Sequence, residues 1–240
     1  MKYLFLVALS LLISCQTPKK ELTAQEIIDK AMKVAGADKV ANANISFDFR
    51  DKSYEAIRKN GVFQLKRSFD SITDVLSNQG FQRSIHGNQM QLSDSLANVY
   101  ANSVNSVHYF SVLPYGLNDA AVRKKLLPSS KIQGKEYYKI EVTFSENGGG
   151  EDFEDVFIYW IDAQSFMMDY LAYSFHTNGG GKRFRAIKNA AIVDGIRFVN
   201  FDNYQPTSEA ISLSDLDTAF EKKQLEKVSE IVLENLKVKL

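Results

Sequence analysis

Five short segments between residues 136 and 204 constrain the fold more than any other feature of the sequence. Each is rich in β-branched and aromatic residues, and a polar or glycine-rich turn separates it from the next. The turns are Asn147-Gly148-Gly149-Gly150, Asp162-Ala163-Gln164-Ser165, Asn178-Gly179-Gly180-Gly181 and Val193-Asp194-Gly195. Connections of this length join neighbouring antiparallel strands. The sequence therefore predicts five strands, each paired with the next along the chain.

The side chains of these strands indicate how deeply each one is buried. Tyr138, Ile140, Val142 and Phe144 lie on one side of the first strand, and polar residues occupy the other side. In the next two strands, at 156–161 and 170–175, both sides are largely apolar. Both faces of these strands must therefore be covered by other elements, unless one face lines a cavity.

The rest of the chain is predicted as strands interrupted by helices. Alternating apolar residues indicate strands at 45–49, 63–69, 72–76 and 81–92. Capping residues and helical spacing predict helices at 23–36, 94–109, 118–126 and 215–223. Residues 228–240 are compatible with a helix or a strand, and we favour a strand because apolar and polar residues are interleaved there.

These elements predict a β-rich α+β fold. Its architecture is an incomplete, half-closed antiparallel β-barrel of about ten strands, with an N-terminal helix and a helical insertion. We expect residues 23–240 to form a single domain, since this length and a hydrophobic content of 45% suffice for one core.

The N-terminus has the pattern of an exported lipoprotein. Residues 1–14 are predicted to be a signal peptide, because their apolar run is shorter than the roughly 20 residues that span a bilayer. The run ends in Leu12-Ile13-Ser14-Cys15, which resembles the bacterial lipobox. Cys15 is then the lipidated first residue of the mature protein, and residues 15–22 are a tether.

This anchor predicts a location in the bacterial cell envelope. Gln16 follows the cysteine where an aspartate would signal retention in the inner membrane, which favours the outer membrane, facing the periplasm. The chain carries 29 basic and 29 acidic residues, so nothing in its charge indicates a nucleic-acid partner. The protein partner is left open.

Residues for catalysis or metal binding are scarce. His86, His108 and His176 are far apart in sequence, and the only cysteine is Cys15. Phosphate-binding and dinucleotide-binding glycine motifs are absent. We therefore predict no catalytic residue, no metal site and no cofactor. An enzyme stays a third alternative, which would gain support if the fold brought His108 or His176 against a carboxylate.

The high content of aromatic and aliphatic residues in the predicted sheet has two interpretations. It is either a core packed under helices or a concave surface that binds an acyl chain or another apolar ligand. The candidate ligand-binding residues are Phe47, Phe49, Phe63, Leu65, Tyr138, Ile140, Val142, Phe144, Tyr159, Trp160 and Tyr173. The favoured function is a non-catalytic, membrane-anchored lipid-binding protein.

A second hypothesis uses the glycine-rich hairpins. In a meander, the turns at 147–150 and 178–181 lie at the same end of the sheet. Glu151 and Asp152 follow one turn, and Lys182, Arg183 and Arg185 follow the other. This rim would suit an envelope scaffold that meets a protein or glycan without lipid cargo.

Several short motifs resemble the LolA/LolB-like superfamily and a group of uncharacterised bacterial lipoproteins within it. They are Phe47-Asp48-Phe49-Arg50, Asn60-Gly61-Val62-Phe63, Gly134-Lys135-Glu136-Tyr137-Tyr138-Lys139-Ile140 and Tyr159-Trp160-Ile161-Asp162-Ala163. Ala163 stands where that superfamily usually has proline. The resemblance implies a half-closed barrel plugged by helices that holds acyl chains. A lipid-contacting arginine of such carriers would correspond to either Arg50 or Arg67.

Overall fold

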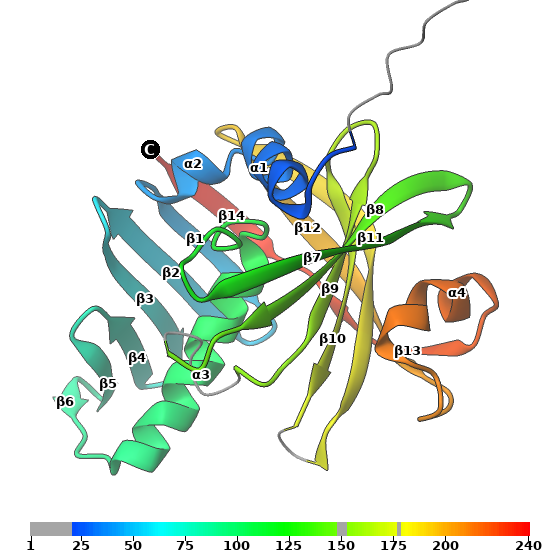
Figure 1. Cartoon of the computed structure of the whole chain (residues 1–240). Helices are drawn as coiled ribbons and strands as arrows, with labels where there is room; N and C mark the ends of the chain where they lie inside the picture. The colour runs from blue at the N-terminus through cyan, green and yellow to red at the C-terminus, as the bar shows by residue number, and fades with distance from the viewer. Residues whose placement is uncertain (1–20, 148–152, 177–178) are drawn as a thin grey trace, which may run out of the picture.

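A computed structural model describes residues 21–147, 153–176 and 179–240 (Figure 1). Within these residues the chain forms two antiparallel sheets of seven strands each, and neither sheet closes on itself. The β-rich, open antiparallel architecture agrees with the prediction from the sequence. The number of strands is larger than the predicted ten or so.

The first sheet contains the N-terminal strands and the last strand of the chain. Its strands are β1 (Asn44–Phe49), β2 (Lys52–Lys59), β3 (Val62–Phe69), β4 (Ile72–Ser77), β5 (Gly80–Ile85), β6 (Asn88–Gln89) and β14 (Glu234–Lys239). The order across the sheet is β14-β1-β2-β3-β4-β5-β6, so sequence neighbours pair from β1 to β6.

The second sheet contains the five predicted strands. Its strands are β7 (Val122–Ile132), β8 (Lys135–Phe144), β9 (Phe157–Asp162), β10 (Met168–Phe175), β11 (Gly181–Val193), β12 (Ile196–Pro206) and β13 (Leu225–Ile231). Neighbour pairing from β8 to β12 confirms the prediction. Strands β13 and β14 confirm the strand assignment of the C-terminal segment, and their connection links the edges of the two sheets.

The described helices are few. They are α1 (Ala24–Val34), α2 (Ala37–Val40), α3 (Asp94–Ser111) and α4 (Leu216–Glu221), the last preceded by a 3-10 turn (Leu213–Asp215). The predicted capping box of α1 is present, with Thr23 and Glu26 exchanging side-chain to backbone hydrogen bonds. Ser93 caps α3 by accepting from the backbone N–H of Leu96. Local capping signals thus located both long helices.

The predicted helix at 118–126 is wrong, because strand β7 begins at Val122. Pro128 lies inside this strand, where the pairing with β8 shifts between Leu127 and Ser130. A proline is tolerated there because β7 is at the edge of the sheet and carries a bulge. Strand β2 was also not predicted, since its turn from β1 uses Arg50 at φ 56° in place of a glycine.

The helices cover different faces of the two sheets. Apolar residues of α1 pack on one face of the second sheet, and Leu216 of α4 packs on the other. Figure 1 shows α4 on the far side of the second sheet from α1. Helix α3 lies against the first sheet, on strands β3 to β5. In the described part of the chain, all strand pairings fall within residues 44–239, and the cores use residues 22–238.

Candidate ligand-binding site

The inner face of the first sheet, which faces α3, carries an unusual row of side chains. Directly paired residues across β1 to β5 place Phe47, Tyr54, Arg67, Asp74 and Arg83 side by side. Residues two positions apart on a strand share a face. The apolar end of this row is continuous with the core, and its charged end lies beneath α3.

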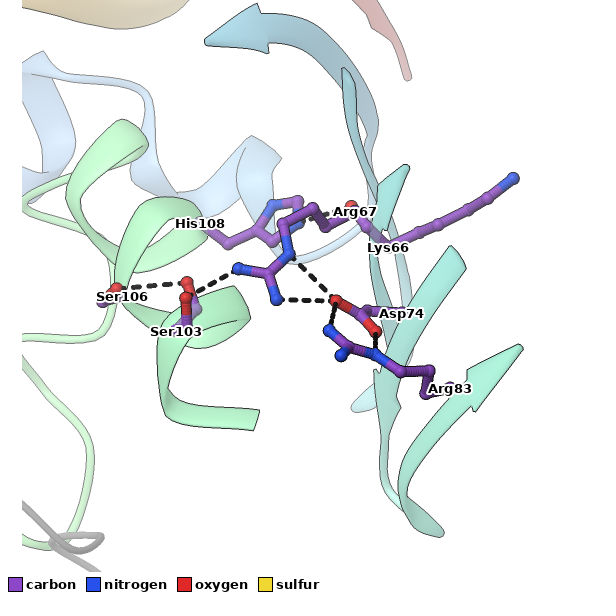
Figure 2. A network of polar contacts seen from close by, with 7 residues as sticks. All are labelled: Lys66, Arg67, Asp74, Arg83, Ser103, Ser106 and His108. Carbon is purple, nitrogen blue, oxygen red and sulfur yellow. Dashed lines mark hydrogen bonds and ion pairs between the residues drawn. The ribbon is translucent and has the colours of Figure 1, made fainter. Parts of the chain in front are cut away.

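Asp74 is the centre of the charged end (Figure 2). Its side chain is fully buried and accepts from two arginines. Arg67 donates from Nε and Nη2 to Oδ2, at 3.0 and 2.6 Å. Arg83 donates from Nε to Oδ1 at 2.6 Å and from Nη2 to Oδ2 at 2.9 Å. The single carboxylate therefore accepts four hydrogen bonds from two buried guanidinium groups.

The same two arginines attach α3 to the sheet. Arg67 Nη1 donates to Ser103 Oγ at 2.6 Å, and the Arg83 guanidinium lies 3.5 Å from the ring centroid of Tyr100. Both partners belong to α3. Polar and cation–π contacts therefore help to attach this helix to the first sheet.

Complete burial is confined to a few residues of α3, although Val107, Tyr109 and Phe110 in its C-terminal half also pack against the two cores. Of its 18 residues, only Val104, His108 and Ser111 are buried. The ring of His108 packs against Phe47 and Tyr54, and its Nε2 lies 3.1 Å from the carbonyl oxygen of Lys66. Burial lowers the pKa of His108 to about 4, so the ring is neutral at neutral pH and donates to this carbonyl.

A cavity of about 260 Å³ opens where β2, β3, α3 and the segment after α3 meet. Phe63, Leu65 and Val112 provide apolar wall, and the rings of Tyr109 and Tyr115 complete it. This volume is just below the roughly 300–1,000 Å³ typical of ligand sites. The cavity can hold part of an apolar molecule, and displacement of α3 would extend it along the inner face of the sheet.

Arg58 is the one basic residue of the cavity wall. Only 8% of it is exposed, and its Nη1 has no hydrogen-bond partner among the described residues. Its guanidinium carbon lies 5.5 Å from the ring centroid of Tyr115. Burial lowers the pKa of Arg58, because an apolar surrounding disfavours the charged form. The cavity therefore combines apolar walls with an incompletely satisfied cation.

The sequence profile of the protein family DUF6503, a family of unknown function, matches residues 2–234. The chain belongs to this family. Comparison with the curated proteins finds no match.

Solved structures similar to this DUF6503 chain have very different sequences. One is a DUF1329 family protein from Desulfovibrio piger, with 9% identity, a TM-score of 0.50, and coverage of 90% of this chain and 92% of that chain. Another is a LolA superfamily protein from Nitrosomonas europaea, with 11% identity, a TM-score of 0.49, and coverage of 92% and 93%. A LolA superfamily protein is thus among the matches, as the sequence motifs predict. At such identities the similarity concerns the fold alone.

The predicted ligand-binding residues of the DUF6503 chain separate into four places, one of which holds Trp160 alone. Phe63 and Leu65 line the cavity. Phe47 and Phe49 belong to the core beneath the first sheet. On the inner face of the second sheet, in the cluster with α1, lie Tyr138, Ile140, Val142, Phe144, Tyr159 and Tyr173. Three of these, Ile140, Val142 and Tyr159, are completely buried by the protein itself.

Trp160 lies on the opposite face from Tyr159, as adjacent residues of a strand must. Its indole Nε1 donates to Asp217 Oδ2 at 3.0 Å, and Lys139 Nζ donates to the same oxygen at 2.9 Å. Burial and these partners give Trp160 a place in the core under α4. It cannot share a surface with the other candidates.

The proposed rim is only partly described. Cys15, Gly148 to Asp152 and Asn178 lie outside the described residues. Of the basic residues, Lys182 donates to backbone carbonyls of Glu209 and Ile211. Arg185 is buried, with its guanidinium 4.1 Å from the ring centroid of Phe110. Arg185 therefore belongs to the interior and not to an exposed rim.

The described residues offer little for metal binding or for catalysis by histidine. Residues 21–147, 153–176 and 179–240 contain no cluster of three or more histidine, cysteine or acidic residues that could hold a metal. His176 Nδ1 lies 3.4 Å from Asp155 Oδ1, but the histidine side chain is 67% exposed and lines neither cavity described here. His108 faces a carbonyl oxygen. None of the helices in the same ranges has the length and apolar character needed to cross a bilayer.

Arg58 was not recognised as a candidate from the sequence. Neither Arg50 nor Arg67, the two arginines suggested by the resemblance, lines the cavity. Arg50 is in the turn between β1 and β2, and Arg67 is paired with Asp74. The available signal was alternation along β2, which places Arg58 on the same buried face as Tyr54 and Ala56.

A second cavity, of about 280 Å³, lies over the other face of the first sheet. Polar side chains that include Ser46, Asp48, Ser53, Glu55 and Lys66 make up most of its lining. Its apolar surface is smaller than that of the cavity beside α3, which is therefore the better candidate for an apolar ligand.

Proposed function

We propose that this protein is a non-catalytic, lipid-anchored envelope protein that binds an acyl chain or a similar apolar ligand between the first sheet and α3. The cavity beside α3 carries the proposal, because it joins an apolar wall to a helix with little buried surface. Phe63 and Leu65 are the ligand contacts expected from the sequence that line it.

The energetics favour such a ligand. Each Å² of apolar surface removed from water contributes about 25 cal/mol, so a methylene chain in the cavity would gain binding energy from its own apolar surface and from the exposed part of Phe63. Leu65 and Val112 are already buried and provide contact surface for the chain. Displacing the N-terminal half of α3 would cost few apolar contacts, since residues 94–103 are all exposed or half-buried. A long chain could then extend across the inner face toward Ala56.

The anchor is part of the proposal. Removal of residues 1–14 and acylation of Cys15 would hold the fold at a membrane through the tether of residues 15–22. We place it in the outer membrane, facing the periplasm, where an apolar ligand could be received from or delivered to the bilayer. A Cys15→Ser chain should lose incorporation of an alkyne-labelled palmitate analogue that the unaltered chain shows.

The direct test is native mass spectrometry of residues 21–240, the segment that contains all described strand pairs and cores. The protein is purified without denaturant and extracted with organic solvent. We expect a co-purifying fatty acid or phospholipid, or uptake of a fluorescent fatty acid if the ligand is lost.

A matched pair of variants locates the site. Ala41→Phe places a ring in the cavity wall, whereas Ala97→Phe adds the same ring to α3 away from the cavity. Only the first should reduce lipid content. Equal lipid content in both variants would place the ligand elsewhere, and an empty protein that takes up no fatty acid would favour the scaffold alternative.

A further inference from the structure

Unsatisfied buried polar atoms are rare in folded proteins, and each needs a physical explanation. The described residues contain four such side-chain atoms: Arg58 Nη1, Arg185 Nε, Asp202 Oδ1 and Asn203 Oδ1. Of these four residues, only Arg58 lines either of the two cavities described above. Its missing partner would therefore lie in space that a ligand can occupy.

Arg67 and Arg83, on β3 and β5 of the same sheet, have the hydrogen-bond partners that Arg58 lacks among the residues that the structure describes. Arg67 and Arg83 share the carboxylate of Asp74, and each makes two hydrogen bonds to it. For Arg58, no ion pair within 4 Å is present in the described part of the chain. The inner face beneath α3 thus holds three buried arginines and one buried carboxylate.

The cavity wall does not supply the missing anion. Its one acidic residue, Asp119, is exposed, and no ion pair joins it to Arg58 within the described residues. The ring of Tyr115 offsets only part of the desolvation of Arg58.

An anion entering the cavity would regain the lost interaction. A buried cation gains most from a charged partner that also accepts hydrogen bonds, and guanidinium matches carboxylate and phosphate oxygens. Because Phe63, Leu65 and Val112 line the same cavity, the anion and an apolar chain could occupy it together.

We propose that the ligand is an anionic amphiphile whose carboxylate or phosphate head group pairs with Arg58 while its chain lies against Phe63 and Leu65. This inference rests on the proposed function, since it names the chemical class of the ligand at the same cavity. It makes Arg58 the residue that distinguishes anionic from neutral lipids.

The test is isothermal titration of residues 21–240 with four probes: dodecanoate, dodecyl phosphate, 1-dodecanol and acetate. The unaltered protein should bind the two anionic amphiphiles at least tenfold more tightly than the alcohol, and acetate far more weakly still. Arg58→Met should remove the difference in affinity between dodecanoate and dodecanol, whereas Arg58→Lys should keep part of this difference.

Lys59→Met is the matched control, because it removes the same charge one residue away, on the exposed face of β2. It should leave the preference unchanged. The urea midpoint of Arg58→Met should not fall, since the change replaces an incompletely satisfied buried charge with an apolar side chain. A folded Arg58→Met protein that keeps the preference would overturn the assignment.

The remaining outcomes separate the inference from the proposed function. Equal binding of dodecanoate and dodecanol by the unaltered protein would refute the anionic ligand and leave lipid binding intact. Failure to bind any of the three amphiphiles would refute the proposed function as well. Acetate binding as tight as that of dodecanoate would indicate a site for small anions without an acyl chain.

Discussion

The two sheets bury their inner faces in different ways. Helix α1 buries Ile27, Ile28 and Ala31 among aromatic and aliphatic side chains of the second sheet, within only 11 residues. Helix α3 is longer, at 18 residues, and buries no more residues than α1; contacts with Arg67 and Arg83 attach the part before Val104. Helix α1 is part of a core, whereas the N-terminal half of α3 is a cover attached largely by polar groups and only its C-terminal half joins the cores.

This difference indicates where the molecule can change shape. Local opening is easiest where few apolar contacts are lost, and binding elements are commonly drawn from such regions. The second sheet would then act as a stable framework, while α3 and the inner face of the first sheet adapt to a ligand. The following predictions test this division, beginning with the largest expected effect.

Substitution Asp74→Asn should have the largest effect. It removes the carboxylate that pairs with Arg67 and Arg83, and it leaves two buried cations without a counter-charge. Breaking a buried pair in this way costs about 3–5 kcal/mol. Urea unfolding should show this loss in the free energy of unfolding.

Glu141→Gln is the control for that loss. It breaks the more exposed pair with Lys125 on the second sheet, where the atoms are 3.6 Å apart. A cost of about 1 kcal/mol or less is expected there. Similar costs for the two substitutions would mean that the buried cluster does not stabilise the first sheet.

Acidification should loosen α3 through His108. Burial holds the pKa of this histidine at about 4, below its ordinary value of 6.5, so the unfolded chain binds the proton more readily than the folded one. Stability is therefore complete above about pH 6.5 and falls as the pH decreases toward 4, by at most about 3 kcal/mol. The nearby Arg58 and Arg67 also oppose protonation.

Hydrogen exchange at pH 7 and pH 5 can locate this effect. Amides of α3 should lose protection at the lower pH, while those of β9 and β10 keep it. His108→Gln should remove most of the difference between the two pH values. If the variant retains the full pH dependence, another group controls the opening.

The sequence predicted the regular parts of the fold because their signals are local. Hairpin turns and alternation located β8 to β12, and the caps at Thr23 and Ser93 located α1 and α3. Strand β7 could not be predicted in the same way. Whether a chain tolerates Pro128 in a strand depends on that strand being at an edge, which is decided by the whole sheet.

The candidate site could be predicted only in part. Alternation places Phe63 and Leu65 on the inner face, but it cannot show whether neighbouring elements fill the space beside them. Strand β9 is apolar on both faces, so the sequence did not distinguish Tyr159 from Trp160. Alternation along β2 places Arg58 on the inner face, but this strand was not predicted from the sequence, so the signal for a polar group in the apolar wall was missed.

The smallest predicted effect concerns a single contact between the two layers. Ser103→Ala removes the acceptor of the Arg67 Nη1 hydrogen bond but leaves the pairing with Asp74 in place. Loss of a hydrogen bond to a charged group costs about 1.5–3 kcal/mol when the donor stays buried, and less when water can replace the acceptor. Because Ser103 is exposed on α3, we expect a value near about 1 kcal/mol.

The location of this loss distinguishes a cover from a core element. If α3 is a cover, Ser103→Ala should increase hydrogen exchange within the helix and speed the uptake of a fluorescent fatty acid, with no change in exchange across β9 and β10. Ser106→Ala is the matched control, since its hydroxyl donates to the carbonyl of Ser103 within the same helix. Increased exchange in the second sheet after Ser103→Ala would show that α3 and that sheet unfold together, and the division between framework and cover would then be wrong.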